Sequence, residues 1–171
     1  MTPPTPTLQA GDTVPDGTFR YIPYTEDLKD TVTQSLDITE DLKGKKVVLF
    51  SVPGAFTPTC HVNHLPPYLQ HYDDFKAKGV DIIAVVAAND PFVMSGWGRF
   101  EGVKDKILCL SDPEAEWSGK IGLALDMSQL HFGIRTARYA MIIDDLVITY
   151  IATEPGPGVT VTGAEALLAE L

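Results

Sequence analysis

Cysteine is scarce in this chain of 171 residues, which contains only two, Cys60 and Cys109. Two cysteines cannot build the disulfide framework of a small secreted protein, so we interpret each first as a free thiol. Cys60 is followed by His61, Val62 and Asn63, so a Cys-x-x-Cys pair is also missing. That absence excludes a dithiol cycle within such a motif and the attachment of a c-type heme.

Basic residues and long hydrophobic runs are also few. The chain has 13 Lys and Arg against 23 Asp and Glu, a net charge of −10. Such a chain repels a phosphate backbone, so we expect no nucleic-acid partner. The longest apolar segments, residues 47–52 and 82–88, are far shorter than the roughly 18 residues of a membrane span. We therefore expect no membrane partner either.

The ends of the chain carry no clear targeting signal. The N-terminal segment has neither the basic start nor the apolar middle of a secretory signal. The C-terminal Ala169-Glu170-Leu171 has the small and leucine ends of a peroxisomal address, but an acidic residue stands where a basic one is usual. We expect a cytoplasmic protein, with the peroxisome as the alternative.

Composition and pattern predict one α/β domain over residues 9–171, preceded by a flexible Pro/Thr-rich tail at residues 1–8. We expect little regular structure before residue 40. Apolar runs predict strands, and helical spacing with caps such as Asp90-Pro91 predicts helices. The strands are expected at 45–52, 80–87 and 107–110, the helices at 61–78, 91–100, 113–120 and 163–171, and a hairpin at 138–143 and 147–152. This order indicates a thioredoxin-like three-layer sandwich with a mixed central β-sheet flanked by helices.

The strongest chemical signal surrounds Cys60, which follows the first strong strand through the segment Pro53-Gly-Ala-Phe-Thr-Pro-Thr-Cys60. Thr57 suits the helix N-cap and Pro58 the first helical position, so Cys60 falls in the first turn. There the Thr57 hydroxyl could accept from the Cys60 N–H. Free N–H groups and the helix dipole stabilise a thiolate, so we expect a reactive Cys60 rather than an inert core thiol.

These residues resemble the active-site motif of the peroxiredoxins, and Pro-Gly-Ala-Phe-Thr-Pro-x-Cys is similar to their type II, or peroxiredoxin 5, subfamily. The resemblance covers about residues 8–171, and the layout of the first forty residues is closest to that of fungal members. Further similar segments are His64-Leu65-Pro66, Asn89-Asp90-Pro91-Phe92-Val93, Trp97-Gly98, Ser111-Asp112-Pro113 and Arg138-Tyr139-Ala140.

The resemblance implies a thiol-dependent peroxidase that reduces hydrogen peroxide and alkyl hydroperoxides, with Cys60 becoming a sulfenic acid. By the same analogy, Thr57 and the Cys60 N–H hold the peroxide and Pro53 shields the sulfur. Arg138 would stabilise the thiolate and the charge on the leaving oxygen. Arg135 receives no role. The resemblance also implies a homodimer across the face that carries the active-site loop.

The subfamily pattern fails at the second cysteine. The two positions of an internal resolving thiol hold Val85 and Val161, and residues 31–33 offer no cysteine. Cys109, flanked by leucines, is interpreted as a buried core thiol. We therefore expect a one-cysteine mechanism in which glutathione, glutaredoxin or thioredoxin reduces the sulfenic acid.

Other candidate residues lie around this motif. Phe56, Phe92 and Phe132 could line an apolar mouth for alkyl hydroperoxides, although we expect Phe92 to pack in the core. Trp97 is expected in the core or against the active-site loop. We expect His64 to support the loop or a subunit contact rather than to act as a base. His71 lies roughly 10 Å from it along a helix, too far for a shared zinc site. No cofactor or metal is expected.

Two other functions stay open. Without an internal resolving thiol, oxidised Cys60 could pass a disulfide to a client protein, which would make the chain a redox sensor or relay. A Cys–His hydrolase is the third reading, and it requires a base and an oxyanion-holding site near Cys60.

Overall fold

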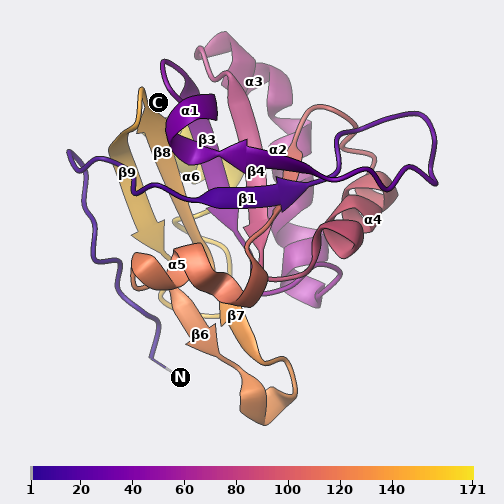
Figure 1. Cartoon of the computed structure of the whole chain (residues 1–171). Coiled ribbons are helices and arrows are strands. Elements are labelled where there is room, and N and C mark those ends of the chain that lie inside the picture. The colour runs from indigo at the N-terminus through magenta and orange to yellow at the C-terminus, as the bar shows by residue number, and fades with distance from the viewer. Residues whose placement is uncertain (1) are drawn as a thin grey trace.

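The computed structural model describes residues 2–171 and places a seven-stranded mixed sheet at the centre of the fold (Figure 1). The strand order is β2-β1-β5-β4-β3-β8-β9, and β6 pairs with β7 in a separate small sheet. The strands are β1 (Thr18–Tyr21), β2 (Gln34–Asp37), β3 (Lys46–Ser51), β4 (Ile82–Ala87), β5 (Leu108–Ser111), β6 (Ala124–Asp126), β7 (Ile134–Thr136), β8 (Tyr139–Asp144) and β9 (Val147–Thr153).

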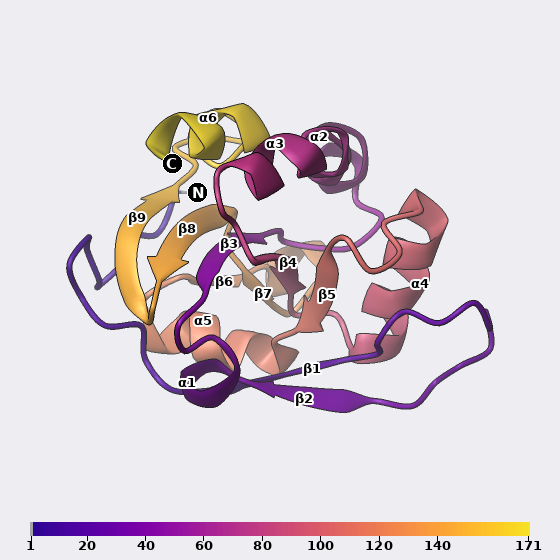
Figure 2. The same cartoon turned by 90° about the horizontal axis from the view of Figure 1, so that it is seen from above.

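Helices cover both faces of the sheet. Figure 2 shows α2, α3 and α6 on one face, with α1 and α5 on the other. The helices are α1 (Ile38–Asp41), α2 (Leu65–Gln70), α3 (Tyr72–Ala77), α4 (Pro91–Glu101), α5 (Glu116–Lys120) and α6 (Ala164–Glu170). The expected three-layer sandwich is confirmed. Among residues 2–171, no helix is long and apolar enough to cross a membrane.

Alternation along the central strands divides the apolar core into two layers. In β3, Val48 and Phe50 pack beneath α2 and α3, whereas Val47 and Leu49 belong to the cluster under α1 and α5. Successive strand side chains point to opposite faces, so a strand covered on both sides is apolar throughout. The continuous apolar run that predicted this strand thus places it at the centre of the sheet.

The predicted helix over residues 61–78 is broken into three pieces in the structure. A π-helical turn spans Cys60–His64, α2 follows it, and His71 separates α2 from α3. The pair Pro66-Pro67 starts α2 because proline lacks the N–H that an interior helical position needs. Helical structure begins at Pro58, and the turn that starts at the cysteine is a widened π-helical turn rather than a regular one.

Two other expectations differ in detail. Residues 18–41 contain β1, β2 and α1, where we expected little structure, because these elements are too short to show a hydrophobic period. The helix expected at 113–120 starts as a 3₁₀ turn, since Glu114 and Ala115 adopt positive φ. Asp112 consequently accepts from the N–H groups of Trp117 and Ser118, one turn further on.

Candidate active site

Cys60 lies just beyond the end of the central strand β3, where the chain turns into the helical segment over residues 58–70. Its side chain is completely buried, within the core layer that contains Phe50 and Leu65. The predicted place in the first helical turn is confirmed, because helical structure begins at Pro58. Burial keeps bulk water from the sulfur, so its chemistry depends on the few polar groups around it.

The Thr57 hydroxyl does not cap the helix as expected. It donates to the Gly54 carbonyl oxygen at 2.7 Å, and among the described residues it accepts no hydrogen bond from the Cys60 N–H. The loop around Gly54 turns back toward Thr57, and this places the Gly54 carbonyl oxygen beside the hydroxyl proton. The oxygen lone pairs of Thr57 consequently stay available to a molecule that enters the site.

Arg138 is the charged group closest to the sulfur. Its Nη2–H donates to Cys60 Sγ at 3.2 Å, and its Nη1–H donates to His64 Nδ1 at 2.9 Å. Arg138 immediately precedes β8, which runs antiparallel to β3 with Ala140 opposite Phe50. The end of β3 and the start of β8 therefore meet at one edge of the sheet, which brings these distant residues together.

His64 orients Arg138 by accepting a hydrogen bond as a neutral ring. Its Nε2 lies 2.9 Å from the Thr162 carbonyl oxygen, which can only accept, so the ring proton is on Nε2 and Nδ1 accepts from Arg138. Burial lowers the pKa of His64 to about 4. The hydrogen bond to the Thr162 carbonyl oxygen acts to raise this pKa, whereas the positive charge of Arg138 acts to lower it. The support role expected for His64 thus has a concrete partner in Arg138.

Glu154 fixes the loop that presents Thr162. Its carboxylate accepts from the N–H and hydroxyl groups of both Thr160 and Thr162, at 2.6 to 2.8 Å. Burial raises the pKa of Glu154, but these hydrogen bonds outweigh burial and hold the pKa below its usual range. Sequence reasoning missed Glu154 and Thr162, because both follow β9, about a hundred residues after the cysteine motif.

Arg135, to which the sequence assigned no role, braces the loop before Cys60. Its Nη1–H donates to the Pro53 carbonyl oxygen at 3.2 Å, and its Nε–H donates to the Phe132 carbonyl oxygen at 2.8 Å. The guanidinium also lies over the Phe132 ring, 5.5 Å from its centroid. Arg135 therefore orients Pro53 and Phe132 and does not contact the sulfur.

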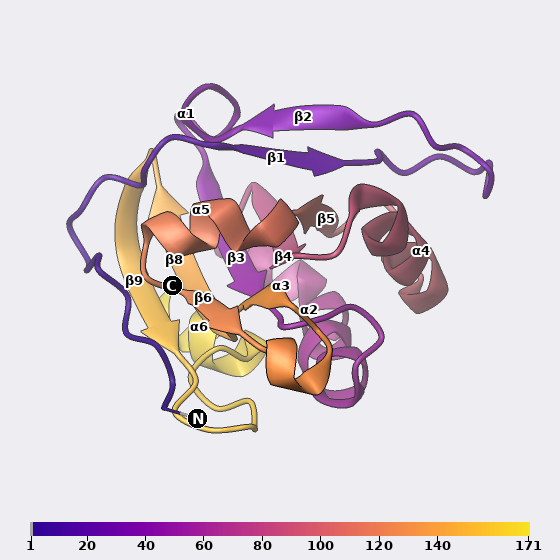
Figure 3. The same cartoon turned by 60° about the horizontal axis from the view of Figure 1, so that its bottom comes forward.

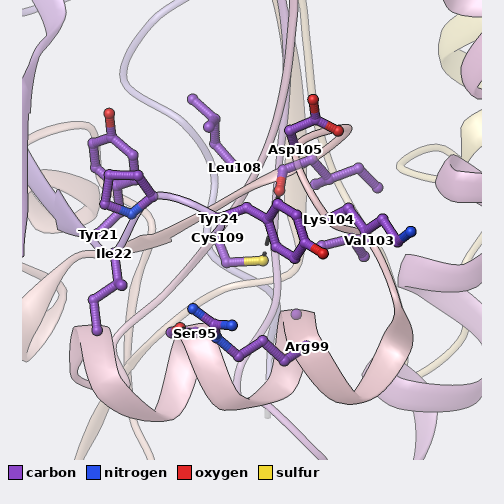
Figure 4. A pocket seen from close by; sticks show the side chains of 13 residues that line it. Tyr21, Ile22, Tyr24, Ser95, Arg99, Val103, Lys104, Asp105, Leu108 and Cys109 are labelled. Carbon is purple, nitrogen blue, oxygen red and sulfur yellow. Dashed lines mark hydrogen bonds between the residues drawn. The ribbon is translucent and has the colours of Figure 1, made fainter. Parts of the chain in front are cut away.

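Cys109 is buried on β5, as expected, and its sulfur faces a separate cavity of about 220 Å³ (Figure 4). Tyr24 and Arg99 line this cavity with it. A Cβ placed on Gly98 would lie 2.6 Å from Cys109 Sγ, so α4 packs directly on the thiol. Burial raises the pKa of Cys109 to about 12, so this thiol is protonated at neutral pH.

The aromatic candidates divide between interior and surface. Phe132 lines a cavity together with Arg138 and Thr57, as expected for an apolar mouth, whereas Phe56 is half exposed and does not line it. Phe92, which we expected in the core, is exposed at 54%, because it lies in the first turn of α4 on its solvent side. Trp97 is fully buried as predicted and donates to His61 Nδ1.

The described residues include no cluster of three or more metal-ligating side chains.

Comparisons with known proteins place this geometry in a family. The Redoxin family model matches residues 9–168. Peroxiredoxin Pen c 3 of Penicillium citrinum is 47% identical over 153 residues, covering 86% of this chain and 88% of the relative. Peroxiredoxin-2B of Arabidopsis thaliana is 38% identical over 164 residues, covering 96% and 98%.

Solved structures of peroxiredoxins are also similar to this chain. The reduced Prx3 of Vibrio vulnificus in complex with H₂O₂ superposes with a TM-score of 0.86 at 41% identity, covering 95% of this chain and 98% of that one. Peroxiredoxin 5 of Alvinella pompejana gives a TM-score of 0.80 at 37% identity, covering 95% and 97%. A buried thiol beside an arginine on a thioredoxin-like sheet defines the class, a thiol-dependent oxidoreductase. The chain belongs to the peroxiredoxins, which are thiol peroxidases, and it fits their type II subfamily.

Acid is expected to destabilise the fold through His64. The pKa of this ring is about 4 in the native state against 6.5 ordinarily, so the unfolded chain binds the proton more readily. The stability that His64 contributes is therefore complete above about pH 6.5 and is lost as the pH falls toward 4, with about 2 kcal/mol gone at pH 4.5. Urea unfolding at pH 7 and pH 4.5 measures this loss.

The matched variants are His64→Asn and His131→Asn, the second on an exposed side chain. His131→Asn should lose as much stability between the two pH values as the wild type, and His64→Asn should lose about 2 kcal/mol less. An identical loss in all three proteins would contradict the assignment of the buried neutral ring.

Proposed function

We propose that Cys60 is the sulfur that reduces the hydroperoxide. The Cys60 thiolate attacks the terminal oxygen of the substrate, an S–O bond forms and the O–O bond breaks. The attacked oxygen keeps its hydrogen, so Cys60 becomes a sulfenic acid. The second oxygen leaves with the electron pair and takes a proton to depart as water or an alcohol. The observation that carries this proposal is the 3.2 Å contact between Arg138 Nη2 and Cys60 Sγ.

The neighbouring groups have defined tasks in that displacement. Arg138 stabilises the negative sulfur first and the leaving oxygen later, because a preorganised cation in a water-poor site acts strongly on developing charge. Thr57, whose hydroxyl proton is engaged with Gly54, accepts a hydrogen bond from the O–H of the hydroperoxide and aligns the peroxide with the sulfur. Pro53 closes the site against bulk water. These roles require no cofactor.

A one-cysteine cycle is favoured by the place of Cys109. Cys109 lies beside Val85 of β4, and Val85 lies beside Phe50 of β3, so two strand spacings, about 10 Å, separate Cys109 from β3. The Cys60 sulfur contacts Arg138 next to β8, on the other side of β3. A disulfide needs Cα atoms about 4.4 to 6.8 Å apart, and the Cys109 thiol is protonated as well.

An external thiol therefore completes the cycle. Its thiolate attacks the Cys60 sulfenic acid, which releases water and leaves a mixed disulfide. A second thiol then attacks the mixed disulfide, which restores Cys60 and releases the oxidised reductant. Glutathione, glutaredoxin and thioredoxin are the candidate reductants.

Turnover of Cys109→Ser tests this cycle. We expect the variant to consume H₂O₂ at the wild-type rate when it is supplied with glutathione or with thioredoxin and its reductase, because Cys109 takes no part. Non-reducing mass analysis of the oxidised wild type should show Cys60 joined to glutathione. Loss of turnover in Cys109→Ser, or an internal Cys60–Cys109 bridge in the wild type, would refute the one-cysteine cycle.

We also propose a homodimer across the face next to the Cys60 turn. Phe56 and Phe100 are exposed there at 48% and 70%, and their rings contact each other edge to face. Contiguous exposed aromatic residues are typical of an interface. Sedimentation velocity should find a dimer that Phe100→Asp converts to a monomer, and a monomeric wild type at micromolar concentration would rule this interface out.

A further inference from the structure

A second cavity, of about 470 Å³, opens beside Arg138. Pro53, Thr57 and Arg138 form its inner wall, and Arg138 also contacts the Cys60 sulfur, so the cavity is continuous with the site described above. Three other segments form the outer walls. They are the N-terminal tail at Thr2, Pro3 and Pro4, the β6–β7 region at Leu125, Met127 and Phe132, and the loop after β9 at Pro155, Gly156 and Pro157.

The size and lining of this cavity do not match hydrogen peroxide alone. A water molecule takes up about 30 Å³ of liquid, and hydrogen peroxide is only slightly larger. A volume of about 470 Å³ falls in the range that holds a whole organic molecule, and most of the lining side chains are prolines and other apolar residues. The cavity therefore fits a hydroperoxide with a hydrocarbon body.

The N-terminal tail is held in place as part of the wall. The Thr7 N–H donates to the Ile121 carbonyl oxygen at 3.0 Å, and the tail packs closely on Gly122, where an added Cβ would lie 3.0 Å from the Thr5 carbonyl oxygen. Figure 3 shows the N-terminal tail beside the loop that follows β9, and residues of both line the cavity. Because the anchor involves residues 5–7, removal of residues 2–4 opens the wall and leaves the anchor intact.

The charges of the lining favour an uncharged occupant. Of the described lining residues only Arg138 and Glu154 are charged, and the Glu154 carboxylate is already engaged by Thr160 and Thr162. Glutathione carries two carboxylates and one ammonium group, so with Arg138 as the one cation of the described lining it would place most of its charged groups against proline and leucine, which is costly. An apolar body next to the reactive sulfur meets no such cost.

We propose that Thr2, Pro3 and Pro4 complete a binding pocket for the hydrocarbon body of organic hydroperoxides, so that the N-terminal tail determines which hydroperoxides react fast. This inference rests on the proposed reaction at Cys60. The hydroperoxide group lies against Thr57 and Arg138, and the hydrocarbon body extends between the tail and Leu125. Hydrogen peroxide has no such body and gains nothing from the tail.

The test compares the rate constants for oxidation of reduced protein by cumene hydroperoxide and by H₂O₂. The variants are a chain lacking residues 2–4 and Pro4→Asp, and Gln9→Asp adds the same charge just after the tail, outside the cavity. We expect the first two to react about four- to fifteenfold more slowly with cumene hydroperoxide, the contribution of one or two buried methylene groups. Their rates with H₂O₂, and both rates of Gln9→Asp, should equal those of the wild type.

Each other outcome overturns the inference. Equal slowing with both peroxides would mean that the tail acts on Cys60 itself, and unchanged rates would mean that the tail contributes no binding. Slowing only of reduction by glutathione would assign the cavity to the reductant. If the wild type fails to react with H₂O₂ at all, the proposed function fails instead, which separates the two conclusions.

Discussion

Cys60→Ser is expected to abolish peroxide consumption, with a loss of more than about 1000-fold in the rate of H₂O₂ reduction. A serine hydroxyl is slightly smaller than the thiol, but it is a far weaker nucleophile and does not accept an oxygen atom in this way. Because the site is buried and the side chain is nearly isosteric, the fold should survive the change. Stopped-flow measurement of peroxide loss with reduced protein gives the rate.

Cys109→Ser is the control for this substitution, since it removes the other buried thiol and leaves the Arg138 contact intact. Circular dichroism and thermal unfolding establish that both variants fold. Peroxide consumption by folded Cys60→Ser at a tenth of the wild-type rate or more would show that the reaction takes place elsewhere.

Arg138→Met is expected to slow the oxidation of Cys60 by about 100- to 1000-fold, the usual effect of removing one preorganised donor from a site of developing charge. Methionine keeps much of the length and apolar stem of arginine but donates no hydrogen bond. Both the thiolate and the leaving oxygen lose their stabilising cation.

Arg135→Met provides the matched control, because Arg135 lies nearby with its donors on the Pro53 and Phe132 carbonyl oxygens. Its loss loosens the loop without removing a charge from the sulfur, so we expect less than a tenfold slowing. If Arg135→Met slows oxidation as much as Arg138→Met, the specific role of Arg138 is wrong.

The central fold was predictable because its signals are local. The apolar run at residues 45–52 and the capped helix that begins at Asp90-Pro91 match β3 and α4 within two residues. The β1–β2 hairpin was missed because its strands have four residues each and depend on pairing with each other and with β5. Tertiary pairing of that kind leaves no period in the sequence.

The candidate site also has one part that could be predicted from the sequence and one part that could not. Cys60 at the start of a helix could be predicted from the Thr57-Pro58 pair, but the groups that hold Arg138 could not. His64 and Thr162 are 98 positions apart, and only the packing of the loop after β9 against the π-helical turn brings them to hydrogen-bond distance. The Thr57 hydroxyl was assigned the wrong partner, since the turn that presents the Gly54 carbonyl oxygen is a matter of backbone geometry.

Trapping the sulfenic acid shows directly which sulfur the peroxide oxidises. Reduced protein is treated with one equivalent of H₂O₂ in the presence of a dimedone-type reagent that labels sulfenic acids, and the labelled peptides are mapped by mass spectrometry. The account predicts a label on Cys60, none on Cys109, and almost no label in Arg138→Met over the same short time. A label on Cys109, or full oxidation of Cys60 at wild-type speed without Arg138, would contradict it.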